Sequence, residues 1–494
     1  MRTTLTGCAA ALLLLTLTSH ARAATVQASN CSNAAVQTAI NSASNGDTVV
    51  IPAGSCTWTG TVTIPATKGI TLQGAGMDST VIVNGLSTAG KLLEIGVAAG
   101  NALTRVTGLT LDARMTVGPS FGEQITVGGL GVDRFRLDHL RLRNIRLRGI
   151  VVVATNGGEL SGLIDSNVFE CPGDYSCHAV DLVGSWAGGG TTFEVNAPFA
   201  RPFELGSNKS IYIENNLFDF AYPNDGAIDG FGGIQVVFRF NSVKNTMVGW
   251  HGADSASYRG PHWYEVYGNT FTDTGTAPGA GYFYRGGTGV QFDNQWSSNR
   301  GRFSNGAISI YRARPETFGS FGQCDGSSPW DGNRGIAGVN PGWPCLDQLG
   351  WLFGTGPGIA PIHMPAYFWG DRTNGALTPI GTYEAGHENM SNWLVENRDW
   401  YVEKAGFTGA AGIGVGPLSN RPTSCTAGVA YWATDQGSWN SNGADGQLYK
   451  CTATNTWTHY YTPYPYPHPL TSGGSASSSS TSGPPPPGNI RIVY

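Results

Sequence analysis

A short phrase of alternating apolar and polar residues that ends in asparagine recurs through the middle of the chain. Successive asparagines lie 23, 49, 25, 28 and 25 residues apart, and the interval of 49 spans about two periods with a glycine-rich insertion inside it. The asparagines are Asn144, Asn167, Asn216, Asn241, Asn269 and Asn294. A period in the twenties, built on short alternating strands with glycine and asparagine turns, favours a parallel β-helix over helical repeats.

In such a solenoid each coil lays a short strand about 4.8 Å above the previous one. Alternate side chains then point into a narrow core and stack on the equivalent residue one coil away. We expect this inward row to contain Leu140, Leu142, Leu163, Ile211, Ile213, Val237 and Val266. The asparagine is expected at a corner, where it tolerates left-handed backbone and its amide bonds the asparagines above and below.

Composition and the N-terminus indicate an exported, loop-rich all-β protein. The chain has 494 residues, of which 71 are glycine and only 13% are charged, and its net charge of −5 argues against a nucleic-acid partner. Residues 1–23 read as a bacterial-type secretory signal, with Arg2, an apolar stretch from Ala11 to Leu17, and a small-residue cleavage site ending at Ala23. No later segment is long and apolar enough to predict a membrane span. The expected location is extracellular or at the cell surface.

Eight cysteines remain after the predicted signal, and they fall into four close pairs. An even number of cysteines in an exported chain favours disulfides. Nearest-neighbour pairing predicts Cys31–Cys56, Cys171–Cys177, Cys324–Cys345 and Cys425–Cys451. Zinc binding is the alternative, but no pair has the spacing of a zinc finger.

Changes in pattern divide the chain into segments. A capping helix over Ala34–Ala43 is expected to cover the open end of the coil stack. The predicted segments are an N-terminal cap and first coil (24–60), the parallel β-helix (61–312), a Pro/Gly/Trp-rich insertion (313–392), the last coils (393–420), a small disulfide-bonded β unit (421–470) and a Ser/Gly/Pro linker and tail (471–494).

The first coils carry a recognisable series of motifs. The capping helix is followed by Gly46-Asp47-Thr48-Val49-Val50-Ile51-Pro52 and then by Gly69-Ile70-Thr71-Leu72-Gln73-Gly74-Ala75-Gly76. This series resembles the opening of the pectin-lyase-like superfamily, and the similarity covers about residues 30–310. The resemblance implies a right-handed parallel β-helix. It does not imply one activity, because the superfamily contains lyases, hydrolases, esterases, phage tailspikes and adhesins.

Polar residues that could carry chemistry follow the asparagine corners at similar distances. His178 lies 11 residues after Asn167, and acids or histidine recur 9 to 13 residues after the next two asparagines. Equal distances in successive coils predict stacking on one face. The residues after those asparagines are Asp225, Asp229, His251 and Asp254, and Tyr258, Arg259 and Arg285 come next. The structural alternative is that they only satisfy turns.

Two further groups could contact a glycan. Arg141 and Arg143 alternate with leucines, so they face outward, either as a solvated strand face or as a basic strip that attracts an acidic glycan. The insertion contains four tryptophans that could stack on sugar rings or form its own small core. They are Trp330, Trp343, Trp351 and Trp369.

The main functional hypothesis is a polysaccharide lyase that cleaves an acidic glycan by β-elimination. Arg259 and Arg285 would neutralise the substrate carboxylate, and His251 or Tyr258 would remove the proton beside it. A desolvated Arg259 is the alternative base. Asp225, Asp229 and Asp254 are the candidate ligands for a Ca²⁺ ion, which is the expected cofactor. The Arg-x-Pro-x-x-Arg signature of the family's lyases is absent; the nearest sequence is Arg312-Ala313-Arg314-Pro315.

Two alternatives stay open. The first is a non-catalytic extracellular surface or matrix protein that binds glycan, which the Ser/Gly/Pro tail and the aromatic C-terminal unit suit. The second is a glycoside hydrolase that uses a pair of carboxylates from Asp225, Asp229 and Asp254. A lyase predicts a histidine and arginines close together, and a hydrolase predicts a close pair of carboxylates.

Overall fold

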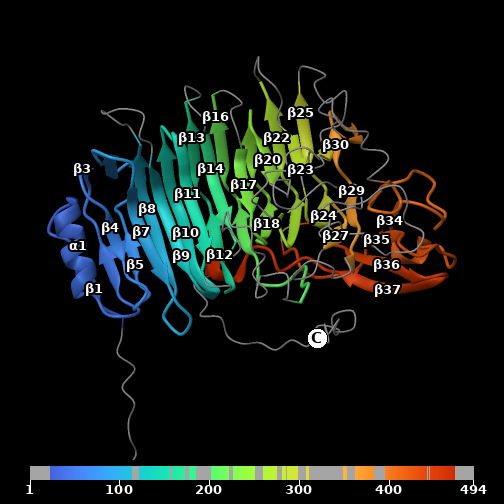
Figure 1. Cartoon of the computed structure of the whole chain (residues 1–494), viewed down its shortest axis with the longest axis horizontal. Helices are drawn as coiled ribbons and strands as arrows, with labels where there is room; N and C mark the ends of the chain where they lie inside the picture. The colour runs from blue at the N-terminus through green and yellow to red at the C-terminus, as the bar shows by residue number, and fades with distance from the viewer. Residues whose placement is uncertain are drawn as a thin grey trace, which may run out of the picture.

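The chain folds as a parallel β-helix, shown by a computed structural model (Figure 1). The structure describes residues 23–113, 122–155, 158–172, 177–184, 202–221, 226–250, 260–274, 281–284, 286–298, 308–310, 349–352, 362–382, 395–441, 443 and 445–472. Three long parallel faces make up the coil stack, and a four-stranded sheet follows at the C-terminal end. The fold class expected from the repeat is confirmed.

Strands of equivalent position in successive coils pair in parallel to form the faces. Face 1 consists of β1 (Thr25–Gln27), β2 (Thr48–Val50), β5 (Thr71–Gln73), β8 (Thr104–Asp112), β10 (Gly131–Arg143), β12 (Leu160–Asp165), β15 (Ile211–Glu214), β18 (Gln235–Arg239), β21 (Trp263–Tyr267), β24 (Gly289–Phe292), β29 (Ala366–Trp369) and β33 (Trp400–Val402). Face 2 consists of β3 (Gly54–Trp58), β6 (Thr80–Asn84), the second halves of β8 and β10, β13 (Val168–Cys171), β16 (Leu217–Phe220), β19 (Ser242–Lys244), β22 (Thr270–Asp273), β25 (Gln295–Ser298) and β30 (Arg372–Thr373).

Face 3 forms a separate ten-stranded parallel sheet. It consists of β4 (Val62–Ile64), β7 (Lys91–Val97), β9 (Glu123–Gly129), β11 (Leu147–Ala154), β14 (Cys177–Val183), β17 (Gly226–Phe231), β20 (Met247–Trp250), β23 (Gly281–Tyr284), β26 (Ile308–Ile310) and β32 (Ile380–Thr382). Two short antiparallel pairs complete the stack: β27 (Trp351–Leu352) with β28 (Ile362–His363), and β30 with β31 (Ala376–Leu377).

Helix α1 (Asn33–Ser42) covers the N-terminal end of the stack, as predicted (Figure 1). Ser32 is its N-cap and accepts a hydrogen bond from the backbone nitrogen of Ala35. Val36, Ala39 and Ile40 are the residues that it buries. The Lys68 ammonium donates to the carbonyls of Ile40 and Ala43, so a cation from the next coil satisfies the C-terminal end of the helix.

The predicted asparagine ladder runs through five coils. Asn167, Asn216, Asn241 and Asn269 each donate from the backbone nitrogen and from Nδ2 to the Oδ1 of the next asparagine, at 2.9 to 3.0 Å. Asn294 ends the series by donating to the buried carboxylate of Asp371. Burial raises the pKa of Asp371 to about 7.

Asn144 was predicted to begin this ladder, and that prediction is wrong. The residue one coil before Asn167 is Leu140, whose backbone nitrogen donates to Asn167 Oδ1. Asn144 lies at another corner with a positive φ of 54°, and its amide donates to Asp112. Each coil has several corners that suit asparagine, so spacing alone did not separate them.

The small β unit near the C-terminus packs on the outside of face 1. It contains β34 (Ile413–Gly416), β35 (Ala430–Ala433), β36 (Gln447–Ala453) and β37 (Thr456–Tyr461), with 3₁₀ helices η7 (Leu418–Asn420) and η8 (Pro469–Ser472). Strands β36 and β37 form the predicted hairpin. After β37 the chain runs back along the stack toward β12, and Arg136 of β10 donates to the carbonyl of Leu470 (Figure 1).

This covering layer corrects two predictions about the core. Leu163 and Val237 were expected to point inward, but they are buried in the outer cluster between face 1 and the C-terminal unit. The other members of the predicted row that the inner cluster contains are Leu140, Leu142, Ile211, Ile213 and Val266. Strands β12 and β18 are buried along their whole length, because the C-terminal unit covers the outward side on which Leu163 and Val237 lie beside Asp165 and Arg239. An apolar residue can therefore be buried on either side, and its apolar character does not reveal which side is inside.

A further correction concerns the range predicted as an irregular insertion. Most of residues 313–392 lie outside the described residues, but 366–382 supply β29, β30 and β32, one strand for each face. The run Ala366–Trp369 is buried on both sides and shows no alternation. Trp351 and Trp369 are also buried, at 3% and 1% exposure, so neither offers a surface for sugar.

Three of the predicted disulfides lie in the described residues and are formed: Cys31–Cys56, Cys171–Cys177 and Cys425–Cys451. The fourth pair, Cys324 and Cys345, lies outside them, as do residues 1–22 of the predicted secretion signal. Disulfides are typical of exported proteins. Within the described parts of the chain, we find no helix with the length and apolar character of a membrane span.

Candidate functional site

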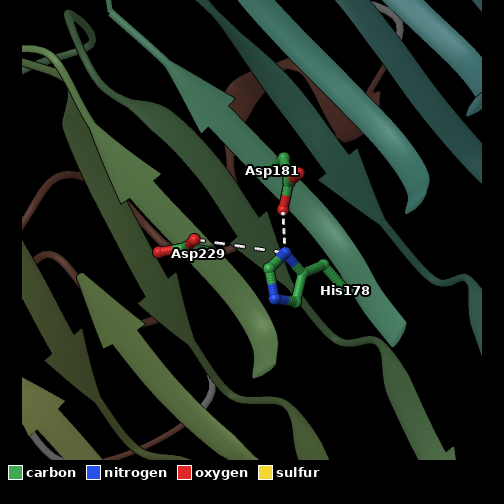
Figure 2. A group of neighbouring side chains, drawn as sticks. All are labelled: His178, Asp181 and Asp229. Carbon is green, nitrogen blue, oxygen red and sulfur yellow. Dashed lines mark hydrogen bonds and ion pairs between the residues drawn. The ribbon is translucent and has the colours of Figure 1, made fainter. Parts of the chain in front are cut away.

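Face 3 brings a histidine and two aspartates together on neighbouring coils (Figure 2). Asp181 on β14 lies directly opposite Asp229 on β17, because the two strands are in register through Val180 and Ile228. The residues flanking Asp181, Val180 and Leu182, are fully buried. Asp181 and Asp229 therefore occupy the outward row of face 3.

The three side chains are within bonding reach of one another. His178 Nδ1 lies 2.8 Å from Asp181 Oδ1 and 4.0 Å from Asp229 Oδ2. One ligand atom from each residue lies within 4.8 Å of the other two. The side chain of His178 is 26% exposed and that of Asp229 16%, whereas Asp181 is nearly covered at 3%. In neutral His178 the Nδ1–H donates to Asp181, so the ring's lone pair is on Nε2.

The two preceding coils add a cation and a third acid. Arg148 Nε on β11 lies 2.6 Å from Asp181 Oδ2, and Arg148 Nη1 lies 3.5 Å from Glu123 on β9. The hydroxyl of Thr126 also donates to Glu123. With His178 neutral, this group of Glu123, Arg148, Asp181 and Asp229 carries three negative charges and one positive charge. Its local charge is therefore negative, which favours a cation beside the carboxylates.

Sequence reasoning named His178 and Asp229 but missed Asp181 and Arg148. Asp181 lies 14 residues after Asn167, and Asp229 lies 13 residues after Asn216. That near-equality was a usable signal, because Asp181 and Asp229 hold almost the same place after successive asparagine corners. Arg148 belonged to a cluster of arginines whose individual roles depend on which acid each one meets.

The remaining predicted site residues are distributed as follows. Those outside the described residues are Asp225, His251, Asp254, Tyr258, Arg259, Arg285, Trp330 and Trp343. His251 directly follows β20 and Arg285 directly follows β23, the two strands that pair next along face 3 through Trp250 and Tyr284. Their predicted roles stay predictions.

Arg141 and Arg143 lie on β10 at about one-third exposure and are paired with acids. Arg141 Nη1 is 3.0 Å from Asp78, and Arg141 Nε is 3.6 Å from Glu170. Arg143 Nε is 2.9 Å from Asp112. These contacts reduce the positive charge that the strip would show to an acidic glycan.

The His178, Asp181 and Asp229 group could bind a metal ion. Two carboxylates and one imidazole suit a transition metal, whereas Ca²⁺ takes roughly six to eight oxygen ligands. Of the three aspartates predicted to hold Ca²⁺, Asp229 is the one that the structure describes, and Asp181 supplies a second carboxylate beside it. The described residues therefore fit a divalent cation through two carboxylates, with further ligands needed to complete a Ca²⁺ shell.

No protein-family model matches the chain, and no curated protein sequence matches it. Among solved structures, an alginate lyase from Paenibacillus sp. str. FPU-7 is similar at 15% identity and a TM-score of 0.32, over 55% of this chain and 95% of that one. ORF18 of Geobacillus virus E2 is similar at 12% identity and a TM-score of 0.27, over 89% of this chain and 77% of that one. A PL6 family polysaccharide lyase from Pseudopedobacter saltans is similar at 11% identity and a TM-score of 0.33, over 77% of this chain and 84% of that one. Sequence identities and TM-scores this low do not support any conclusion about activity.

Proposed function

We propose that this protein is a polysaccharide lyase that cleaves an acidic glycan by β-elimination on face 3. The observation that supports the proposal is the group of His178, Asp181 and Asp229 on the outward row of β14 and β17. A base oriented by a carboxylate, next to a site that attracts a cation, is what β-elimination beside a carboxylate requires.

His178 is the proposed base. Its Nδ1–H bond to Asp181 holds the ring in the tautomer whose Nε2 accepts a proton. Nε2 takes the proton at C5 of the uronate, the C5–H electron pair forms the C4–C5 double bond, and the C4–O bond breaks. The departing oxygen takes a proton from solvent or from a neighbouring acid. Asp181 stabilises the imidazolium that forms, as in other carboxylate–histidine pairs.

The charge of the site indicates how an acidic substrate is accommodated. Three carboxylates against one guanidinium would repel a uronate. Asp181 and Asp229 would hold a divalent cation, and a cation held there would supply the positive charge that neutralises the substrate carboxylate. Ca²⁺, the ion predicted from the sequence, is the first to test, although the described residues provide only part of its ligands. Arg148 orients Asp181, since Arg148 Nε lies 2.6 Å from Asp181 Oδ2.

The test measures the ultraviolet absorbance of unsaturated uronate on a panel of acidic polysaccharides, with added Ca²⁺ and with a chelator. His178→Ala should lower the rate by about 10²- to 10⁴-fold. His139→Ala is the matched control, since His139 Nδ1 makes a similar 2.7 Å contact with Asp138 on β10 and its side chain is 57% exposed. An unchanged rate in His178→Ala, or no unsaturated product from any substrate, would contradict the proposal.

A glycoside hydrolase is the second candidate, because Asp181 and Asp229 face each other across adjacent strands with oxygens within 4.8 Å. Retaining glycosidases hold their two carboxyl groups about 5 to 5.5 Å apart. New reducing ends without unsaturated product, abolished in both Asp181→Asn and Asp229→Asn, would favour this reading. Glycan binding without either product would favour the non-catalytic alternative.

A further inference from the structure

Among the described residues, Arg239 and Arg421 each lie against at least two aromatic rings, but only Arg239 is also paired with an acid. Arg239 of β18 is fully buried on face 1, with its guanidinium 4.8 Å from the ring of Tyr212 and 5.2 Å from that of Tyr466. It also lies 2.6 Å from the carboxylate of Glu214, which is equally buried. This cluster is complete, because the protein supplies both the rings and the anion.

Arg421 has the rings without the anion. Its guanidinium lies 4.6 Å from the ring of Tyr449 and 5.3 Å from that of Trp457. Arg421, Tyr449 and Trp457 are each partly exposed. Across the residues that the structure describes, the Arg421 side chain makes no hydrogen bond or ion pair, and its Nη1 is covered without a partner. The nearby acid Asp435 instead accepts from the backbone nitrogen of Leu418.

The surroundings of Arg421 hold this arrangement in place. Arg421 directly follows η7, while Tyr449 and Trp457 come from the paired strands β36 and β37. Trp457 Nε1 donates to the carbonyl of Pro422 at 2.7 Å. The Cys425–Cys451 disulfide ties the segment that carries Arg421 to β36. A guanidinium held between two rings loses little further freedom when it binds an anion.

Other aromatic residues of the C-terminal unit are used internally. Tyr461 donates to buried Glu265, and the backbone carbonyls of Tyr464 and Pro465 accept from Arg239. The ring of Tyr466 packs against that of Phe240 at a tilt of 32°, and the Tyr466 hydroxyl donates to Asn215. These residues attach the unit to face 1. Tyr449 and Trp457 belong to a different part of the hairpin.

We propose that Arg421, Tyr449 and Trp457 form a binding subsite for an anionic sugar, with the guanidinium taking a carboxylate or sulfate group and the rings contacting the sugar faces. A guanidinium fits either oxyanion with two parallel hydrogen bonds. The negative charge of the chain, −5, disfavours a nucleic acid as the source of the anion. In taking a glycan as ligand the subsite rests on the proposed function, but it is separate from His178 and can be tested by itself.

The experiment measures equilibrium binding by the full chain, by calorimetry, at low and high salt. The ligands are oligogalacturonate for carboxylate, a sulfated dextran for sulfate, and neutral dextran as the uncharged control. Arg421→Met keeps the side-chain stem between the rings and removes the charge, and Arg421→Lys keeps the charge and removes the planar fork. Arg372→Met is the matched control, because Arg372 has similar exposure but is 3.6 Å from Glu403.

Arg421→Met should weaken binding of one anionic glycan at least about tenfold, as expected for loss of a charge-assisted pair. Arg421→Lys should lose less affinity than Arg421→Met. Arg372→Met should bind the anionic glycans as the wild type does, and none of the variants should change binding of neutral dextran. The stronger of the two anionic ligands identifies the group. Wild-type affinity in Arg421→Met, with an unchanged melting temperature, would overturn the subsite. Loss of binding in Arg421→Met in a protein that releases no product would support the subsite while contradicting the lyase.

Discussion

Faces 1 and 3 are built by the same coils but use their outward side chains differently. On face 1 the C-terminal unit covers the outward row, so Arg239, Glu214 and Glu265 are buried at zero exposure. On face 3 the outward row carries His178 and Asp229 at 26% and 16% exposure. A charged residue on a β-helix therefore becomes structural or chemically available according to what lies over it, not according to its position in the coil.

The buried charges of Arg239, Glu214 and Glu265 on face 1 all have partners. Glu214 accepts from Arg239 and from the backbone nitrogen of His468, and Arg239 donates to the carbonyls of Tyr464 and Pro465. Glu265 accepts from the Tyr461 hydroxyl and from the backbone nitrogen of Gly206. Burial still raises the pKa of Glu265 to about 7. These three charges depend on their partners, so removal of one partner should lower the free energy of unfolding more there than on face 3.

The largest expected effect is on the Arg239–Glu214 pair. Arg239→Ala should lower the free energy of unfolding by about 3 to 5 kcal/mol, because it leaves the Glu214 carboxylate and two carbonyls buried without their donor. Denaturant unfolding followed by fluorescence measures the change. The double variant Arg239→Met with Glu214→Leu should recover part of the loss, since no buried charge then remains. A decrease in the free energy of unfolding below about 1 kcal/mol in Arg239→Ala would show that solvent screens the pair as it screens an exposed one.

A smaller, pH-dependent effect is expected at Glu265. Its pKa of about 7 in the folded protein exceeds the ordinary value of 4.5, so the folded state binds the proton more tightly than the unfolded state. The stability that this group contributes is complete below about pH 4.5 and is lost as the pH rises through about 7.

Glu265→Gln should therefore be more stable than the wild type at about pH 8, by roughly 1 to 3 kcal/mol, and should lose that advantage near pH 4. Unfolding midpoints at the two pH values measure the difference. Glu94→Gln on face 3, in an exposed pair with Lys91, is the matched control. A constant difference between wild type and Glu265→Gln across this range would contradict the raised pKa.

The smallest expected effect concerns the Lys91–Glu94 pair on β7 of face 3. Its atoms lie 2.6 Å apart, close to the distance in the Arg239–Glu214 pair, but both side chains are 41% exposed. Lys91→Ala should change the free energy of unfolding by about 0 to 1 kcal/mol because solvent screens the interaction. The difference between the losses of free energy in Lys91→Ala and in Arg239→Ala measures the effect of the covering layer. A loss comparable to that of Arg239→Ala would remove the distinction between the two faces.

Local signals in the sequence predicted much of the fold. The period of the asparagines predicted the ladder from Asn167 to Asn294, and the N-terminal pattern predicted α1. Both succeed because each depends on residues that act within one coil or on its immediate neighbour. The hairpin of β36 and β37 was predicted for the same reason.

The site was predicted only in part. His178 and Asp229 were named, but their partners Asp181 and Arg148 were not, because strand register decides which residues of adjacent coils meet. Leu163 and Val237 were assigned to the wrong side because a covering layer from more than 200 residues later buries the outer side as well. That layer is a long-range contact with no local signature.

The sequence by itself determined the solenoid, the asparagine ladder from Asn167 to Asn294, the capping helix and the three cysteine pairs within the described residues. These features depend on residues that are close in sequence or lie on neighbouring coils. The tertiary structure alone decided which face is covered and which charges are left partly exposed. The physical reason is that burial of a charge depends on the final position of a distant segment, here the return of residues 461–472 along face 1. Because residues 461–472 cover face 1, Arg239 is buried and structural. His178 lies on face 3 and is partly exposed.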